Sequence, residues 1–237
     1  MKLIMVMPAY NEEKAIRNVL ESWMHEFNDA IGTDDYRIII VDDGSRDETS
    51  VKITGMHDPH IILMSQPNSG HGKALYHGYM QALNMKPDWI FQTDSDGQTD
   101  PADFKKLWDA RNDNNVIMGY RKHRQDGLFR MFSTRVLRLV FAILFHHHIV
   151  DSNTPFRLMK YDAFKNAMLM MQPEPDFTNI LLTAAFIGNH EHIEFIETSF
   201  KPRDTGVNSV NMRNMGAKGI DAIKEMLAFK TRRRKMK

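Results

Sequence analysis

The sequence of 237 residues contains no cysteine and no excess of charge of either sign. Without cysteine it can form neither a disulfide nor a thiolate metal site, which fits a reducing compartment. Lys and Arg total 31 and Asp and Glu total 30, whereas nucleic-acid-binding proteins usually carry a broad basic excess. We therefore expect a protein of the cytoplasm, or of the cytoplasmic face of a membrane, without a nucleic-acid partner.

The chain also lacks a long hydrophobic run. Its longest later apolar stretch, 136–145, is interrupted by Arg138 and falls well short of the ~20 residues that cross a bilayer. The apolar N-terminus, 1–8, is too short for a secretion signal and is typical of a buried first strand. We expect neither a transmembrane helix nor secretion.

Short apolar runs alternate with helical patterns through the first half of the chain. The runs typical of buried strands are 3–7, 37–41, 61–64, 89–93 and 116–118. The segments with helical periodicity or helix-start signals are 12–27, 47–54, 72–83 and 101–112. This alternation predicts right-handed β-α-β units and an α/β fold with a doubly wound, mostly parallel sheet flanked by helices.

Two carboxylates follow the fourth of these apolar runs directly. Asp94 and Asp96 are separated by Ser95, and Gln98 comes two residues later. Carboxylates at this spacing can share a hard divalent cation and present it to a diphosphate. A solvated acidic turn gives the same short pattern, so the surroundings decide between the two interpretations.

Segments rich in polar and acidic residues follow other predicted strands as well. Residues 8–13 follow the first strand and residues 42–45 the second. In open α/β sheets, ligands bind outside the carboxyl ends of the strands. The positions of these segments therefore favour a binding site over an acidic turn.

Six separated motifs, in the same order, resemble those of family 2 glycosyltransferases of the GT-A fold, and more narrowly those of the dolichol-phosphate mannosyltransferase group. They are P-A-Y-N-E-E (8–13), V-D-D-G-S-R-D-E-T (41–49), N-S-G-H-G-K-A (68–74), D-S-D-G-Q (94–98), G-Y-R (119–121) and R-D-T-G-V-N-S (203–209). The resemblance implies one GT-A domain over residues 1–229. A Rossmann-like, nucleotide-sugar-binding half would cover 1–119 and an acceptor-binding half 120–229, followed by a basic tail, 230–237.

The same resemblance implies a donor site for a nucleoside diphosphate sugar with Mg²⁺ or Mn²⁺ as cofactor. The implied donor ligands are Pro8, Tyr10, Glu12, Asp42, Asp94, Ser95, Arg121 and Arg203, and the implied metal ligands are Asp94, Asp96 and Gln98. Asp96 is the more direct metal ligand, and Asp94 is shared between ribose and metal.

Structural alternatives remain open at several of these positions. Pro8 and Tyr10 are also compatible with packing at a strand end, and residues 42–45 with a helix-initiating turn. The glycine-bearing segment 68–74 favours a structural turn slightly over a phosphate contact, and it is not a Walker A loop. Arg121 is equally compatible with a solvated loop cation.

The segment D-S-N-T-P-F-R (151–157) matches the place where the mannosyltransferase group carries acceptor residues, with Pro155 in place of the usual Gly. The resemblance implies that Arg157 and Ser209 bind the acceptor. Asp151 orders the loop or acts as a catalytic base, which completes the implied catalytic set of Asp94, Asp96, Arg121 and Asp151. Packing of Phe156, with Arg157 extending to solvent, is the structural alternative.

The predicted reaction is inverting transfer of a sugar from GDP-mannose or a UDP-hexose to a polyprenyl phosphate, which is already ionised and needs no general base. The first alternative is transfer to a sugar hydroxyl, for which Asp151, Glu174 or Asp176 serves as base. Glu174-Pro175-Asp176 fits helix capping equally well. A second alternative is a non-catalytic nucleotide-sugar-binding module.

Two basic segments are compatible with peripheral membrane contact. Residues 128–141 mix apolar side chains with Arg130, Arg135 and Arg138, and residues 230–235 form a basic cluster after a helix predicted over 217–229. A core helix with solvated arginines and a solvated tail are the alternatives. The run His146-His147-His148 predicts surface or interface histidines and no metal site.

Overall fold

The central strands are mostly apolar and mostly buried. In the computed structural model, which describes residues 2–33, 35–121, 128–201 and 215–236, all seven residues of β1 (Leu3–Ala9) are buried. Burial also runs through β2 (Tyr36–Asp42) and β4 (Trp89–Gln92) with little interruption. Continuous hydrophobic strands of this type are covered by helices on both faces of a parallel sheet.

The sheet has seven strands in the order β3-β2-β1-β4-β6-β5-β7. The remaining strands are β3 (Ile61–Ser65), β5 (Val116–Tyr120), β6 (Arg157–Lys160) and β7 (Ile193–Glu197). Neighbouring pairs are parallel except at β6, which runs antiparallel to β4 and to β5. The predicted α/β fold with a mostly parallel sheet is confirmed, although β6 and β7 were not among the predicted strands.

One face of the sheet is covered by helices from the first half of the chain. These are α1 (Ile16–Ala30), α2 (Thr49–Thr54) and α4 (Phe104–Ala110), which follows the short helix η1 (Pro101–Asp103). Trp23 and Phe27 of α1 pack there against Phe91 of β4 and Phe104 of α4 in a cluster of aromatic rings. This core packs α1, α2 and α4 onto the sheet, below the loops at its carboxyl edge.

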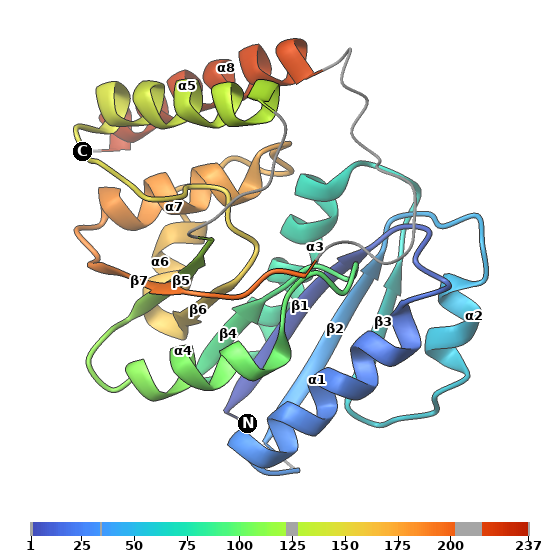
Figure 1. Ribbon diagram of the computed structural model, residues 1–237. Helices are drawn as coiled ribbons and strands as arrows, with labels where there is room; N and C mark the ends of the chain where they lie inside the picture. The colour runs from blue at the N-terminus through green and yellow to red at the C-terminus, as the bar shows by residue number, and fades with distance from the viewer. Residues whose placement is uncertain (1, 34, 122–127, 202–214, 237) are drawn as a thin grey trace.

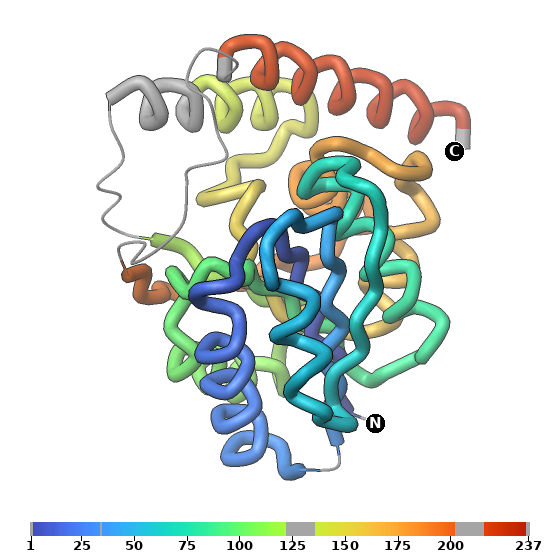
Figure 2. The backbone as a smooth tube through the Cα atoms, turned by 90° about the vertical axis from the view of Figure 1, so that its right-hand side faces the viewer, coloured from blue at the N-terminus to red at the C-terminus, as the bar shows by residue number. Residues whose placement is uncertain are grey.

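The other face carries helices from both halves of the chain. They are α3 (His71–Met85), α6 (Tyr161–Met168) and α7 (Thr178–Gly188). Their buried side chains form a second core with Val6 and Val41. Figure 1 shows α5 (Leu128–Phe145) and α8 (Met215–Met236) side by side as an outer layer over α7, and Figure 2 shows the same layer from the side.

Helix α8 is longer than predicted. It continues to Met236, so residues 230–236, which we expected as a basic tail after a helix ending at Phe229, form its last turns. Arg233 anchors these turns by donating a 2.6 Å hydrogen bond from Nη2 to the carbonyl oxygen of Gly188 at the end of α7. Among the described helices, none is both long enough and apolar enough to cross a bilayer.

Candidate functional site

The loops that follow β1 and β2 are joined by hydrogen bonds into one rim. The amide of Asn11, at a φ of 55°, donates to Ser45 Oγ at 2.9 Å, and the amide of Arg46 donates to Asn11 Oδ1 at 2.8 Å. Glu12 is buried behind this rim, and its amide donates to Thr49 Oγ1 at 2.8 Å. The two loops are therefore held together by hydrogen bonds within the protein.

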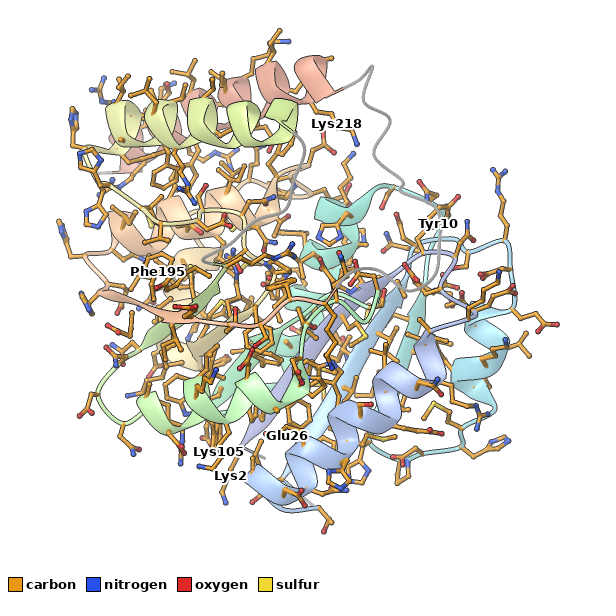
Figure 3. The ribbon with its side chains drawn as sticks, viewed as in Figure 1. Lys2, Tyr10, Glu26, Lys105, Phe195 and Lys218 are labelled. Carbon is orange, nitrogen blue, oxygen red and sulfur yellow. The ribbon has the colours of Figure 1, made fainter. Side chains whose placement is uncertain are left out.

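Tyr10 is the most exposed of the predicted nucleoside ligands in this region. Its side chain is partly exposed, whereas Pro8 lies within β1 and is buried. Figure 3 shows Tyr10 at the carboxyl edge of the sheet, the opposite end from Lys2. The structure thus places an aromatic ring on the rim, where it is accessible to a nucleobase.

The aspartates at the end of β2 organise the turns around them. Asp42 accepts hydrogen bonds from the amide of Ser45 at 3.0 Å and from the hydroxyl of Ser50. Asp43 accepts from the amides of Ser69 and Gly70, both at 2.8 Å. Asp42 therefore shapes the turn that leads into α2, and Asp43 ties β2 to the turn that leads into α3.

The D-x-D pair lies on the loop that directly follows β4, in the middle of the sheet. The loop turns at Gly97, whose φ is 71°, and the amide of Gln98 donates to Asp96 Oδ1 at 3.1 Å. Gln98 is in turn held by Lys201, since Gln98 Nε2 donates to the carbonyl of Lys201 at 3.3 Å and the amide of Lys201 donates back at 2.8 Å. Ser95 is buried between the two carboxylates.

One oxygen of Asp94 lacks a hydrogen bond. The Asp94 side chain is 31% exposed, but Oδ1 is covered by protein and finds no hydrogen-bond donor among the described residues. His71 Nε2, from the first residue of α3, lies 3.8 Å from this atom. Burial raises the pKa of Asp94, and the charge of Asp96 raises it further, while His71, Arg121 and Arg157 act in the opposite direction.

These residues fit a divalent cation whose coordination is completed by oxygen atoms of a substrate. Two carboxylates with one unsatisfied oxygen attract a cation, and Mg²⁺ is typically held by one or two carboxylates together with substrate phosphates. Among the residues that the structure describes, no group of three His, Asp or Glu side chains is arranged to hold a metal alone. Asp94 and Asp96 would supply the protein ligands, with Gln98 beside them.

Arg121 follows β5 at the same edge of the sheet. Its Cζ lies 3.1 Å from the ring centroid of Phe200, a cation–π contact that fixes the guanidinium. Its charge also acts on Asp94, so the cation belongs to the surroundings of the D-x-D pair. The predicted residues Arg203 and Ser209 lie outside the described residues.

Arg157 is fully buried at the start of β6. Its Nε and Nη2 donate to the carbonyl of Thr154 at 3.0 and 2.5 Å, and its Nη1 donates to the carbonyl of Asn179 at 3.2 Å. The alternative in which Arg157 extends to solvent is therefore wrong, while Phe156 packs in the core as that alternative required. Asp151 accepts a 2.9 Å hydrogen bond from the amide of Asn153, so it orders its own loop.

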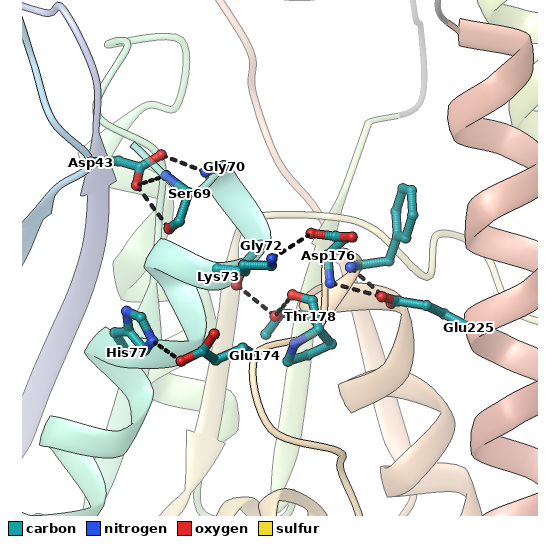
Figure 4. Close-up of polar contacts among 12 residues, drawn as sticks. Asp43, Ser69, Gly70, Gly72, Lys73, His77, Glu174, Asp176, Thr178 and Glu225 are labelled. Atoms are coloured by element: carbon teal, nitrogen blue, oxygen red, sulfur yellow. Dashed lines mark hydrogen bonds and ion pairs between the residues drawn. The ribbon is translucent and has the colours of Figure 1, made fainter. Parts of the chain in front are cut away.

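Helices α3, α7 and α8 meet at the segment 174–177 (Figure 4). Glu225, in the middle of α8, accepts hydrogen bonds from the amides of Asp176 at 2.9 Å and Phe177 at 3.1 Å. The Asp176 carboxylate lies 3.7 Å from Lys73 Nζ on α3, and Glu174 lies 3.3 Å from His77 Nε2. The capping expected of Glu174 and Asp176 is thus supplied to α7 by a residue from α8.

Two residues that make contacts in this region were not identified from the sequence. His71 lies in the motif 68–74, where the only available signal was a histidine at the start of a helix. Glu225 gave no signal, because its partners lie 48 and 49 residues earlier in the chain. The three histidines 146–148 are exposed, as predicted.

The architecture is that of GT-A glycosyltransferases. It combines a mostly parallel α/β sheet, a D-x-D pair after a central strand, and polar loops after β1 and β2. This chain belongs to the family described as Glycosyl transferase family 2, whose model matches residues 4–172. The resemblance drawn from the six motifs is therefore confirmed at the level of the family.

Among curated proteins, the chain is 31% identical over 185 residues to the dolichyl-phosphate beta-glucosyltransferase ALG5D of Trichomonas vaginalis, covering 70% of this chain and 55% of that protein. It is also 31% identical over 144 residues to the undecaprenyl-phosphate 4-deoxy-4-formamido-L-arabinose transferase of Yersinia enterocolitica, covering 59% of this chain and 42% of that protein. The chain thus spans about half the length of the curated relatives it matches.

Solved structures share the fold at low sequence identity. One is glucosyl-3-phosphoglycerate synthase of Mycobacterium tuberculosis in complex with Mn²⁺, uridine-diphosphate-glucose and phosphoglyceric acid, with a TM-score of 0.65, 16% identity, and coverage of 97% of this chain and 80% of that chain. Another is TarS 1-349 of S. aureus in complex with UDP-GlcNAc, with a TM-score of 0.65, 17% identity, and coverage of 96% and 66%. These similarities concern the fold.

Proposed function

We propose that this protein is a metal-dependent, inverting glycosyltransferase that moves a sugar from a nucleoside diphosphate sugar to a polyprenyl phosphate. The observation that carries the proposal is the D-x-D pair, in which Asp94 keeps one covered, unsatisfied oxygen beside His71 and the cation Arg121. The relatives named above, a dolichyl-phosphate and an undecaprenyl-phosphate transferase, support the acceptor class.

The proposed roles of the donor-site residues follow from the negative charge of the leaving diphosphate. Asp94, Asp96 and Gln98 would hold Mg²⁺ or Mn²⁺, which neutralises charge on the departing nucleoside diphosphate. Arg121 adds a fixed positive charge on the same side. The rim with Tyr10, Glu12 and Asp42 would hold the nucleoside. GDP-mannose and a UDP-hexose are the two donors we propose, and solved proteins of this fold bind UDP-sugars.

The acceptor side needs little chemistry from the protein. A phosphate monoester is ionised near neutral pH, so it can attack the anomeric carbon from the side opposite the leaving diphosphate without a general base. Asp151 would keep the acceptor loop ordered, and Ser209 remains our candidate for a contact to the acceptor.

The experiment that tests this function measures release of nucleoside diphosphate from GDP-mannose and from UDP-glucose, with and without Mn²⁺ and a polyprenyl phosphate. The proposal expects release that requires both the metal and the lipid. Donor binding without release under any condition would support the non-catalytic binding module instead.

Transfer to a sugar hydroxyl is a second candidate, because the carboxylate of Asp176 lies at the junction of α3 and α7. This reaction needs a base, so Asp151→Asn, Glu174→Gln or Asp176→Asn would abolish turnover while nucleotide binding stays intact. With a phosphate acceptor, each of these three changes should lower turnover by less than about tenfold, which is below the roughly 100-fold low end of general-base effects.

We further propose that the outer layer of α5 and α8 contacts an anionic membrane, which would bring the site to a lipid acceptor. Leu139 and Ile143 of α5 are 62% and 61% exposed, and α8 exposes Ile220 and Leu227. The last turns of α8 add the exposed cations Arg232, Arg234 and Lys235.

Sedimentation with vesicles tests this contact. The wild type should bind vesicles that contain an anionic lipid, and the double change Leu139→Ser and Ile143→Ser should reduce the bound fraction severalfold. Val51→Ser is the matched control, since Val51 on α2 is 69% exposed and lies on the other face of the sheet. Equal loss with the control, or binding to neutral vesicles alone, would contradict the contact.

A further inference from the structure

We propose that Arg157 is a positioning residue of the donor site, whose buried positive charge behind the D-x-D pair keeps that pair from binding a divalent cation tightly until the donor diphosphate is present. This inference rests on the proposed function and differs from the acceptor contact that the sequence implied for the same residue.

The register of the sheet places Arg157 next to the strand that ends in the D-x-D loop. Arg157 pairs directly with Gln92 across the antiparallel β4 and β6, and paired residues project to the same face of a sheet. Gln92 is buried and accepts a 2.9 Å hydrogen bond from the hydroxyl of Tyr79 on α3. Arg157 therefore lies on the α3 side of β4, and its partner Gln92 is two residues before Asp94.

The guanidinium is held in place there from two directions. The carbonyl of Thr154 accepts from Nε and Nη2, and the carbonyl of Asn179 accepts from Nη1, with Thr183 Oγ1 at 3.4 Å from the same nitrogen. These acceptors belong to the loop before β6 and to α7. Because water does not reach Arg157, it cannot bind a lipid phosphate without leaving these partners.

The neighbours of Arg157 identify what its charge acts on. Its electrostatic interactions are with Asp94 and Asp151 and with Tyr79. Burial lowers the pKa of Arg157, and these neighbours act against that effect. The positive charge thus interacts with the carboxylates of Asp151 and Asp94, and Asp94 is the one whose Oδ1 has no hydrogen-bond donor among the described residues.

The sign of the effect on a metal follows from Coulomb's law. A fixed positive charge behind Asp94 repels a divalent cation in a medium of reduced dielectric constant. A diphosphate brings further negative charge and additional oxygen ligands, which offset that repulsion. Arg157 would therefore make metal binding depend on the donor, so that the two bind together.

The test compares three variants by titrating Mn²⁺ in the absence of nucleotide, with free Mn²⁺ measured by electron paramagnetic resonance. Arg157→Lys keeps the charge and should change the Mn²⁺ dissociation constant less than about twofold. Arg157→Met removes the charge and should tighten it by about tenfold. Arg111→Met is the control for net charge, because Arg111 stacks on Trp108 away from the site, and it should bind Mn²⁺ as the wild type does.

A purely structural role for Arg157 would loosen the site and weaken Mn²⁺ binding in Arg157→Met, which would overturn the proposal, as would unchanged binding. If Arg157→Met does not fold, Arg157→Gln removes the charge while keeping a donor for Thr154, and the same tightening is expected. A rise in the Michaelis constant for the lipid phosphate in Arg157→Lys, with Mn²⁺ binding unchanged, would also overturn the proposal. It would support a contact between Arg157 and the acceptor phosphate instead. Failure of the wild type to transfer sugar would contradict the proposed function and leave the Mn²⁺ comparison standing.

Discussion

The hydroxyl of Thr178 donates a 2.6 Å hydrogen bond to the carbonyl oxygen of Gly72, although 106 residues separate the two. This bond joins the first turn of α7 to the first turn of α3, the helix whose first residue, His71, places Nε2 3.8 Å from Asp94 Oδ1. The geometry of the D-x-D surroundings therefore depends on a contact between the two halves of the chain.

The contact requires glycine at position 72. A Cβ placed there would lie 2.0 Å from the carbonyl oxygen of Asp176, which is backbone and cannot move aside freely. We expect Gly72→Ala to lower the free energy of unfolding by at least about 1–3 kcal/mol, as for other overpacked sites. Gly219→Ala on α8 is the control, because a Cβ added at Gly219 would have no neighbouring atom within 4 Å among the described residues, and it should raise stability by up to about 1 kcal/mol. Equal stability of the two variants in urea unfolding would contradict this contact.

Glu225 secures the other side of the same junction. Removing its carboxylate in Glu225→Ala leaves the amides of Asp176 and Phe177 without their acceptors, so the free energy of unfolding should fall by about 1–2 kcal/mol. Asp221→Asn, which breaks an exposed pair with Lys224 on the same helix, should stay within about 0.5 kcal/mol of the wild type. Urea unfolding measures both, and a loss as large in Asp221→Asn would contradict the capping role.

Tyr36 should make stability depend on pH in the alkaline range. Burial, with a smaller effect of Asp58, raises the pKa of Tyr36 to about 12, compared with about 10 in an unfolded chain. The folded state therefore favours the neutral phenol, and this contribution is complete below pH ~10 and lost as the pH rises toward ~12. The difference in unfolding free energy between the wild type and Tyr36→Phe should be constant below pH ~10. Above that pH, the unfolding free energy of the wild type should fall relative to that of Tyr36→Phe. A difference that stays constant to pH ~12 would be the opposite result.

Arg121 should matter to turnover more than to folding. Its guanidinium is held on Phe200 and acts on Asp94, so Arg121→Met should lower kcat/KM for the donor by about 10- to 100-fold through lost stabilisation of the leaving diphosphate. The midpoint of thermal unfolding should move little. Arg111→Met again serves as the control, and steady-state kinetics with both variants would reveal a nonspecific effect of charge.

Local patterns predicted the first half of the fold well. Continuous apolar runs marked β1, β2 and β4, and the loops that follow them carry the residues expected at a nucleotide-sugar site. The start of α1, at Ile16, was predicted four residues too early. Residues 13–15 form a turn before the helix, and the amide of Glu12 donates to Thr49 of the neighbouring loop.

The second half depends on contacts that no local pattern encodes. Strand β6 has only four residues and begins with Arg157. A charged residue at this position predicts a loop, because the carbonyls of Thr154 and Asn179 that accept its hydrogen bonds cannot be identified from the sequence. Likewise, the approach of Gly72 to Asp176 and the capping by Glu225 arise only when helices distant in sequence pack together. The motifs predict roles at the donor site, which stay predictions, and the hydrogen-bond partners of those residues could not be predicted from the sequence.

The measurement that tests the central claim most directly is a thermal-unfolding panel of the wild type and Asp96→Asn with UDP, GDP and their sugars, each with and without Mn²⁺. A ligand that binds only the folded state raises the unfolding midpoint. We expect one nucleotide to raise the midpoint of the wild type only when Mn²⁺ is present, and Asp96→Asn to lose that rise. No rise with any nucleotide, or a rise that is independent of Mn²⁺ and unchanged in Asp96→Asn, would contradict a metal-dependent donor site at Asp94 and Asp96.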